Sequence, residues 1–403
     1  MNKKLIVAVD FGNNTLSVAA AYKNSDNSLE LLDFQEKELK NGAVNGILQN
    51  PNNILPEINE ILQTIENGNK IKIGGYVFGL EPYTLRSEIK TIQCLSKGND
   101  DANIKALNEE ASKIECDDGR KMLVINQLER QFGSNIKGDF CVTSTSEAVN
   151  EQIVKIVNNF SSERTAKYML SPMVEADAFL SDEDKHKGTL LIDFGAEITS
   201  FALYKDGLLR LCAVVPLGGI HITQDIRERF EVTEKNAEEL KIIYGKATCE
   251  LLSEADKNRG FNVRSDDKII KVHLPELIKT IEARQCEIIN FILQEIDNQH
   301  FNNLYNNIVV VGGASNLNLL PELLQKLSGK NVVKFTPKPL KKENLILNNS
   351  LLIAILAKSG EDCSAIVKPK PDVTPKKPRK PPGFFDRFKG VPDMFKDEHE
   401  KKM

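Results

Sequence analysis

The chain has 403 residues, of which 41% are hydrophobic and 27% charged, and its formal net charge is −4. These values indicate a folded chain of two or more subdomains, and they exclude a collagen-like, a largely disordered or a polytopic membrane protein. No apolar run approaches the roughly 20 residues that a membrane-spanning helix needs. The short apolar run from Leu5 to Val9 ends at Asp10, so we expect a strand there and no export signal.

Cysteines and histidines give no sign of a structural cross-link. Seven cysteines are scattered without a CxxC pair, and the five histidines have no metal-ligand spacing. We therefore expect a reducing compartment, no disulfide framework and no metal bound by histidine or thiolate.

The charge is distributed unevenly. Residues 368–380 hold six basic residues and one acidic residue, and the whole chain carries −4, so the remainder carries −9. An acidic body argues against nucleic-acid binding. A short basic stretch near one end instead favours an anionic lipid surface.

The first 85 residues show a hairpin, a helix and a strand. Residues 5–22 alternate as two apolar strands around the turn cluster Asp10-Phe11-Gly12-Asn13-Asn14. Apolar residues at helical spacing predict a helix over 53–66, and 71–78 is typical of a strand. The polar stretch 86–165 differs from this and predicts an inserted subdomain with helices at 101–114 and 146–159 and a strand at 121–125.

The hairpin pattern then returns. Residues 188–219 predict three strands, and the first turn again carries Asp-Phe-Gly, at 193–195. This internal duplication is the most specific structural signal in the sequence. Helices are expected at 233–247 and 275–298, a strand, a Gly-Gly turn and a helix at 307–328, and a closing helix at 345–357. Six prolines between 369 and 382 predict an extended linker over 361–382.

The two Asp-Phe-Gly turns are candidate phosphate sites. Glycine permits a tight turn whose backbone N–H groups can face phosphate oxygens, and Asp10 and Asp193 can each hold a hydrated Mg²⁺. A single turn of this kind is more often an ordinary hairpin. Two copies, followed by a third glycine turn at Gly312-Gly313-Ala314, favour phosphate binding.

This set of turns resembles the actin-like ATPase superfamily, and three further motifs resemble the FtsA family of bacterial cell-division proteins. These are PLGGIHITQDI at 216–226, AEELKIIYGKA at 237–247 and IEARQCEII at 281–289. The resemblance covers roughly 1–80 and 166–357 well, and 86–165 only by size and position.

The resemblance implies an α/β actin-like fold of duplicated ribonuclease H-like domains around a nucleotide cleft, with an inserted subdomain and a C-terminal amphipathic helix. The implied subdomains are 1A (1–85, 166–186 and the closing helix 345–360), 1C (86–165), 2A (187–222 and 303–344) and 2B (223–302), followed by the linker 361–382 and the helix 383–403. In the family, the C-terminal peptide of the tubulin-like FtsZ docks on 2B.

The resemblance also implies ATP and Mg²⁺ as cofactors. The residues it assigns to the nucleotide are Asp10, Gly12, Asn13, Asn14, Asp193, Gly195, Thr199, Gly218, Gly219, Glu238, Lys241, Gly312, Gly313 and Ala314, with Asp10 and Asp193 also at the metal. Among these, Glu238 and Lys241 would flank the adenine or ribose, and Gly218 and Gly219 would line the phosphate floor.

The phosphate motifs depart from the family pattern. The second motif has lost two glycines, one of them to Glu197, and it ends at Ser200 where the family has Asp. The first motif lacks the family's lysine. A carboxylate facing the γ-phosphate repels it by several kcal/mol in a low-dielectric cleft unless Mg²⁺ intervenes. We therefore expect weak nucleotide binding, little or no hydrolysis and no catalytic residue.

The C-terminal segment 383–403 is a candidate membrane anchor. On a helix, Phe384, Phe388, Val391 and Phe395 fall within about 60° of one another, and Phe385 flanks them. A docked helix is the alternative, and Pro392 would bend the axis. Burial of each apolar side chain contributes about 1.5–3 kcal/mol, but the entropy lost when the segment becomes ordered offsets most of this gain. One segment would therefore bind lipid reversibly. Several segments presented together by a polymer would bind firmly.

The resulting hypothesis is a division protein at the cytoplasmic face of the cell membrane. It would self-associate into filaments, tether FtsZ to an anionic membrane surface at the division site and recruit later division proteins. An actin-like pilus-assembly scaffold and, less favoured, a sugar or acyl-phosphate kinase of the same superfamily are the alternatives.

Overall fold

The computed structural model describes residues 3–364 except 13–14, 40–41, 45, 49, 118, 132–134 and 266–267. The linker beyond Ser364 and the segment 383–403 therefore lie outside the described residues, as do Asn13 and Asn14. Within the described residues, no helix is both long and apolar enough to cross a bilayer.

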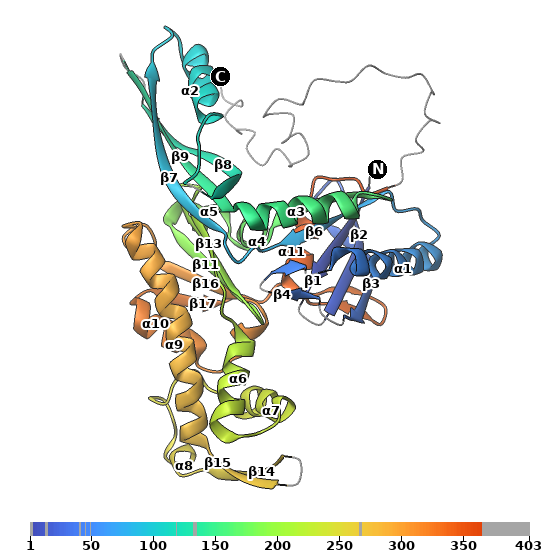
Figure 1. Cartoon of the computed structure of the whole chain (residues 1–403), viewed down its shortest axis with the longest axis vertical. Coiled ribbons are helices and arrows are strands. Elements are labelled where there is room, and N and C mark those ends of the chain that lie inside the picture. The colour runs from blue at the N-terminus through green and yellow to red at the C-terminus, as the bar shows by residue number, and fades with distance from the viewer. Residues whose placement is uncertain are drawn as a thin grey trace.

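Two five-stranded sheets form the body of the molecule (Figure 1). The first has the order β10-β6-β1-β2-β3 and the second β13-β12-β11-β16-β17. The strands of the first are β1 (Lys4–Phe11), β2 (Thr15–Lys23), β3 (Leu29–Glu38), β6 (Gly75–Leu80) and β10 (Thr165–Leu170). The strands of the second are β11 (Thr189–Phe194), β12 (Thr199–Lys205), β13 (Leu208–Val215), β16 (Asn307–Val311) and β17 (Asn331–Lys334).

The two sheets are copies of one plan. In each, three antiparallel strands continue into two parallel ones, because β1 and β11 pair in parallel with β6 and β16. The registers also agree, since Asp10 lies opposite Ser17 and Asp193 opposite Ser200. The predicted duplication and both predicted hairpins are confirmed.

Helices cover the first sheet and separate it from the second. Helices α1 (Pro51–Asn69) and α3 (Glu147–Phe160) pack on each other and on strands of the first sheet. Helix α4 (Ser171–Phe179) packs on α11 (Ser350–Lys358) and also on strands of both sheets. Small segments complete this half: β4 (Ala43–Val44), β5 (Ile47–Leu48), α5 (Asp182–Lys187), β18 (Leu340–Lys342) and β19 (Leu345–Leu347).

The closing helix was predicted over 345–357, and this is partly wrong. Leu345–Leu347 instead pairs with β18 as a hairpin, and the helix begins at Ser350. Asn349 sets that start, because its side chain accepts a hydrogen bond from the N–H of Leu352 (2.9 Å) as an N-cap.

The region 86–165 forms a three-stranded sheet of order β7-β9-β8 with one helix on it. Its elements are β7 (Arg86–Leu95), α2 (Asp100–Ala111), β8 (Arg120–Gln131) and β9 (Asn135–Ser146). The predicted helices and strand are present, whereas β7 and β9 were not predicted. Figure 1 shows this unit beyond one end of β13, away from the helices at the opposite end. Ser87 Oγ donates to the carbonyl of Cys212 on β13 (3.0 Å), and Val214 N–H donates to Leu85 O (3.2 Å), so the unit covers an edge strand.

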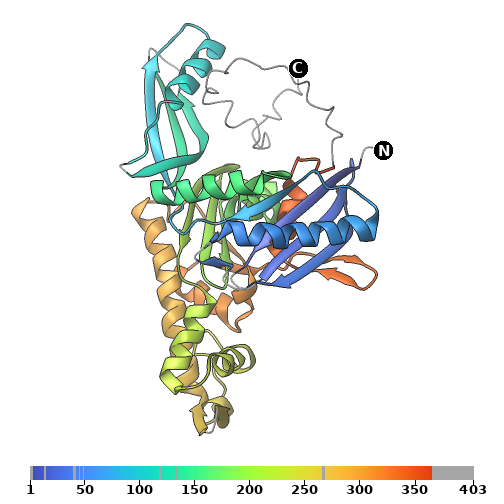
Figure 2. The same ribbon diagram turned by 45° about the vertical axis from the view of Figure 1, so that its right-hand side comes forward.

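The region between β13 and β16 is helical and extends away from the second sheet (Figure 2). It holds α6 (Gly219–Phe230), α7 (Glu234–Tyr244), α8 (Glu254–Lys257), β14 (Gly260–Ser265), β15 (Lys268–His273) and α9 (Leu274–Asn298). The 25-residue helix α9 buries Leu277 and Ile281 in a core shared with α6 and α7, and Ile288 and Ile292 in the core of the second sheet. One helix thus joins two cores.

The last described residues end between two strands of the first sheet. The N–H of Cys363 donates to Leu5 O (2.7 Å), and the N–H of Gly74 donates to Cys363 O (2.7 Å). Ser364 forms an antiparallel bridge with Ile73. The chain therefore leaves the described fold directly from the start of β1 and β6.

Candidate functional site

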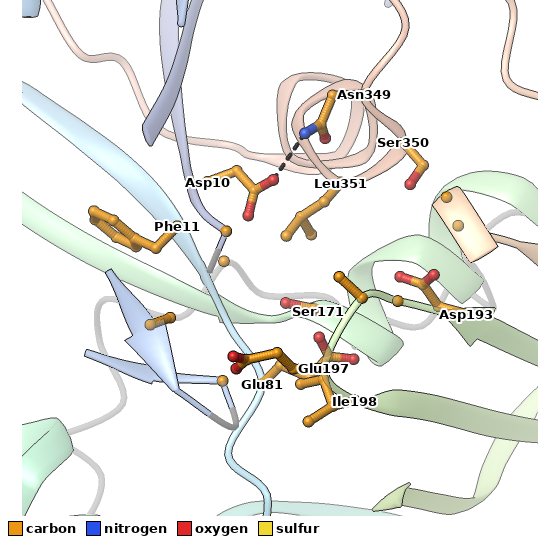
Figure 3. Close-up of a pocket in the computed structure, with 18 of the residues that line it drawn as sticks. Asp10, Phe11, Glu81, Ser171, Asp193, Glu197, Ile198, Asn349, Ser350 and Leu351 are labelled. Carbon is orange, nitrogen blue, oxygen red and sulfur yellow. Dashed lines mark hydrogen bonds between the residues drawn. The ribbon is translucent and has the colours of Figure 1, made fainter. Parts of the chain in front are cut away.

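A cavity of about 600 Å³ lies between the two sheets. It is lined by the ends of β1, β6 and β11, by the turn after β11, by the turn after β16 and by the start of α11 (Figure 3). Carboxyl ends of parallel strands are where open α/β sheets usually place ligands. Six of the predicted site residues line it: Asp10, Gly12, Asp193, Gly195, Gly312 and Gly313.

We refer to the Asp-Phe-Gly turns that follow β1 and β11 as the first and second phosphate turns. Asp10, in the first of them, is hydrogen-bonded to the residue that precedes the closing helix α11. Asn349 Nδ2 donates to Asp10 Oδ2 (2.7 Å), as the dashed line in Figure 3 shows. Burial raises the pKa of Asp10 above its usual range, and the hydrogen bond from Asn349 opposes that rise. Asn349 thus both caps α11 and holds the carboxylate at the end of β1.

Among the described residues, no amide side chain donates in this way to the carboxylate of the second phosphate turn. Asp193 Oδ1 is buried without a hydrogen-bond partner among the described residues. Its neighbour is Glu175 of α4, a side chain with 0% exposure whose carboxyl oxygens receive no hydrogen bond of good geometry from those residues. Burial first, and then the charge of Asp193, raise the pKa of Glu175 well above the usual glutamate range. The two carboxyl groups therefore favour sharing one proton.

The cavity wall is strongly acidic. Its lining carboxylates are Asp10, Glu36, Glu81, Asp193 and Glu197, and Lys334 is the one cation among the described lining residues. Burial and the charge of Asp193 raise the pKa of Glu81, which follows β6. A phosphate group entering this cavity therefore needs a cation with it, because Lys334 alone does not balance the wall.

The third glycine turn approaches the second phosphate turn closely. Gly312 has φ 91°, and a Cβ there would lie 1.8 Å from Asp193 Oδ1 and 2.5 Å from the carbonyl oxygen of Phe194. Only glycine fits that position. A Cβ on the neighbouring Gly313 would meet no atom within 4 Å, so Gly313 faces open space in the cavity.

Helices α6 and α7 lie behind the second phosphate turn. The N–H groups of Gly219 and Ile220 donate to the carbonyls of Gly195 (3.1 Å) and Ala196 (2.8 Å), so these donors are engaged by the turn. Lys241 Nζ donates to Gly219 O (2.9 Å) and pairs with Glu238 (2.7 Å). This cluster joins the cavity through the third glycine turn, because a Cβ on Gly219 would lie 3.3 Å from that of Ala314.

Several predicted positions do not line the cavity. They are Thr199, Gly218, Gly219, Glu238, Lys241 and Ala314. Thr199 is fully buried, and its hydroxyl donates to the carbonyl of Leu217 (2.8 Å). Gly218 and Gly219 are packed against the second phosphate turn, and their place at the phosphate floor stays a prediction.

Sequence reasoning missed Glu81, Ser171, Glu175 and Asn349. Glu81 directly follows a strand that runs parallel to β1, and that placement is a signal that could have found it. The Ser171 hydroxyl lines the cavity, and its Oγ has no partner among the described residues. Glu175 gave no signal, because a lone glutamate on an apolar helix does not reveal which core it enters.

The carboxylate oxygens of Asp10 and Asp193 suit a Mg²⁺ ion that keeps several of its waters better than one surrounded entirely by protein ligands. Mg²⁺ prefers oxygen ligands and keeps several waters, and Asp10 and Asp193 at two strand ends can meet it in that form. Within the described residues, no group of three or more histidine, cysteine or acidic side chains is arranged to hold a metal ion. The ion would therefore depend on phosphate oxygens as well as on these two residues.

The sequence has relatives among curated proteins. A family model described as "Cell division protein FtsA" matches residues 190–355. FtsA of Buchnera aphidicola subsp. Baizongia pistaciae is 23% identical over 352 residues, covering 81% of this chain and 82% of that protein. FtsA of Enterococcus hirae is 31% identical over 185 residues, which is 46% of this chain and 42% of that protein.

Solved structures agree on the fold. A structure titled "PilM-PilN type IV pilus biogenesis complex" gives a TM-score of 0.58 at 15% identity, covering 82% of this chain and 88% of that one. MreB5 of Spiroplasma citri, in a structure titled as bound to ADP, gives 0.50 at 13% identity, covering 87% and 94%. Identities this low speak for the fold alone, and they confirm the predicted actin-like α/β class.

The predicted resemblance to FtsA is thus confirmed, by a relative that matches 81% of the chain and by a family model that matches residues 190–355. The chain is similar to FtsA cell-division proteins, and it has the actin-like fold.

Proposed function

We propose that this chain is a bacterial cell-division protein that tethers FtsZ filaments to the cytoplasmic face of the cell membrane and recruits later division proteins. The similarity to FtsA proteins over more than four fifths of the chain carries the proposal. The FtsZ C-terminal peptide would dock on 223–302, and the membrane contact would be made by the phenylalanine stripe in 383–403. The likeness to the pilus protein is one of fold and adds no second candidate.

In this proposal ATP is an assembly ligand that enters the cavity between the sheets with Mg²⁺. The glycine turns give the backbone close access, and Gly313 faces open space. Mg²⁺ would neutralise phosphate charge beside Asp10 and Asp193. With the carboxylates of Glu81 and Glu197 also lining the cavity, binding would be weak and hydrolysis slow or absent.

The membrane contact is tested by changing its apolar stripe in the full chain. Phe384→Asp with Phe388→Asp should lower recovery on anionic vesicles at least tenfold in flotation, because partial burial of each ring contributes about 1 kcal/mol or more. Lys389→Asp is the matched control, since it also changes the charge by two units but leaves the stripe intact. It should reduce binding only a few-fold. Equal losses in the two proteins would contradict an apolar anchor.

A further inference from the structure

A second cavity lies outside the site between the sheets. It has a volume of about 920 Å³, within the range of ligand-binding pockets. It runs between the start of β7, the end of β13 and helix α9, and we refer to it as the α9 groove. Strand β13 is the edge strand of the second sheet, and its residues line this cavity together with those of β7 and α9. None of its lining residues belongs to the phosphate turns.

The α9 groove exposes aromatic side chains on two walls. Tyr83, before β7, is 40% exposed, and Phe291 of α9 is 46% exposed. The end of β13 contributes Val214 and Val215 to the lining, and Leu217 follows that strand. Exposed aromatic rings on opposite sides of an apolar floor favour an occupant that brings aromatic rings of its own.

The α9 wall is also acidic. Glu287, Phe291 and Glu295 are spaced by four residues, so they share one face of the helix. Glu287 pairs with Arg284, whereas no described cation lies within ion-pair distance of Glu295. On the opposite wall Arg86 already pairs with Asp117 (3.1 Å). The groove therefore offers an aromatic ring between two carboxylates to a ligand that is aromatic and cationic.

One segment of this chain has that chemistry. Residues 376–390 contain six cationic side chains and one carboxylate, and three of the residues are phenylalanines, at 384, 385 and 388. The last described residue, Ser364, lies 20 residues before the first of these phenylalanines. Twenty extended residues span up to roughly 65 Å. That reach is about three times the radius of gyration of roughly 21 Å expected for a compact chain of this length.

We propose that residues 376–390 dock in the α9 groove of the same chain, with a phenylalanine of the segment against Phe291 and its basic side chains facing Glu287 and Glu295. Docking hides Phe384 and Phe388, the part of the apolar stripe that lies in this segment and would otherwise meet lipid. This last consequence rests on the proposed function, because it takes the stripe as the membrane anchor. The docking itself does not depend on that function.

The docking is tested by a photo-cross-link in the full chain. We would place p-benzoylphenylalanine at Asn298, which lines the groove but is neither of its aromatic residues. Irradiation should cross-link position 298 to a peptide within 376–390 at a yield that does not depend on protein concentration. Phe291→Ala should lower that yield at least threefold. Val154→Ala, a change at another exposed apolar residue, on α3, should leave it unchanged.

Three results would overturn the docking. The first is a cross-link whose yield rises with protein concentration, because this would indicate docking on a second copy. The second is a cross-link that maps outside 376–390. The third is the absence of any cross-link in a chain with a wild-type melting curve. Each would show that the groove does not hold this segment of its own chain.

The competition with lipid has a separate readout. On anionic vesicles, the full chain with Phe291→Ala should float at least threefold more than wild type, and Val154→Ala should match wild type. If the cross-link forms but no variant floats, the membrane function fails and the docking stands. If the wild type floats and Phe291→Ala does not increase flotation, the groove does not restrain the anchor.

Discussion

The two sheets share strand order and register, yet the carboxylates at their phosphate turns are held differently. Asp10 receives a hydrogen bond from Asn349, which belongs to a helix at the far end of the chain. Asp193 instead lies beside Glu175, a buried carboxyl group without a good donor among the described residues. The same backbone plan thus gives one satisfied charge and one that needs a proton or a cation. A bound cation would therefore stabilise the turn at Asp193 more than the turn at Asp10.

The largest effect should come from the glycine that touches Asp193. Gly312→Ala places a Cβ 1.8 Å from Asp193 Oδ1 at φ 91°, so it should destabilise the chain by about 2–5 kcal/mol in urea unfolding. Gly313→Ala is the control next to it, and it should change the free energy of unfolding by no more than about 0.5 kcal/mol. Similar losses in both variants would mean that the contact with Asp193 is not tight.

The hydrogen bond to Asp10 at the first phosphate turn is tested by changing Asn349. Asn349→Ala removes both the N-cap of α11 and the donor to Asp10, and it should cost about 2–3 kcal/mol of unfolding free energy. Asn99→Ala removes only an N-cap, on α2, and should cost about 1 kcal/mol. If the two variants lose the same amount, the bond to Asp10 contributes nothing to stability.

Removing the charge of Glu175 should stabilise the protein. Burial raises its pKa above the usual value of 4.5, so the folded chain holds this proton more tightly than the unfolded chain does. The stabilisation is therefore full below pH 4.5 and is lost as the pH rises through the raised pKa. Glu175→Gln should add about 1–3 kcal/mol at pH 8 and flatten the decline in stability between pH 6 and pH 8.

Urea unfolding at the two pH values measures this effect. Glu151→Gln, on the exposed side of α3, is the control and should leave both the stability and its pH dependence unchanged. A Glu175→Gln protein that is less stable than wild type at pH 8 would indicate that the ionised carboxylate is needed in the fold.

The smallest expected effect concerns the ligand. Glu197→Gln removes one carboxylate from the cavity wall, so it should raise the affinity for Mg²⁺-ATP about tenfold, which corresponds to about 1.4 kcal/mol. Calorimetric titration of the full chain measures this, with Glu239→Gln on α7 as a control outside the cavity lining. Unchanged affinity would show that Glu197 does not face the bound phosphates.

The sequence predicted the elements whose pattern repeats or is strongly periodic. The two Asp-Phe-Gly hairpins were visible because each has a buried apolar strand on both sides of a glycine turn. Strands β7 and β9 were not, because most of β7 is only half-buried and its residues are mostly polar. The partners in the β7–β9 pairing are 40 to 58 residues apart in sequence, a separation that local periodicity does not report.

Site residues that lie at the end of a strand could be predicted from the sequence. Site residues whose side chains reach the cavity from a helix could not. Asp10, Asp193 and the glycine turns follow apolar strands, so their positions were readable. Glu175 and Asn349 reach the same place through tertiary packing of α4 and α11. Gly218 and Gly219 show the opposite case, in which a family motif is present but its N–H groups are already engaged. Those of Gly219 and Ile220 donate to the turn beside the motif, and that of Gly218 donates to His221 Nδ1.

The position of Cys363 between β1 and the start of β6 has a mechanical consequence. A pull on the chain beyond Ser364 is transmitted through its backbone hydrogen bonds to Leu5 and Gly74, and so to the centre of the first sheet. The second sheet and the long helix α9 carry none of that load directly. If tension acted between the chain beyond Ser364 and the region of α6–α9, it would therefore cross the cavity between the two sheets, and it would tend to draw the two walls of that cavity apart.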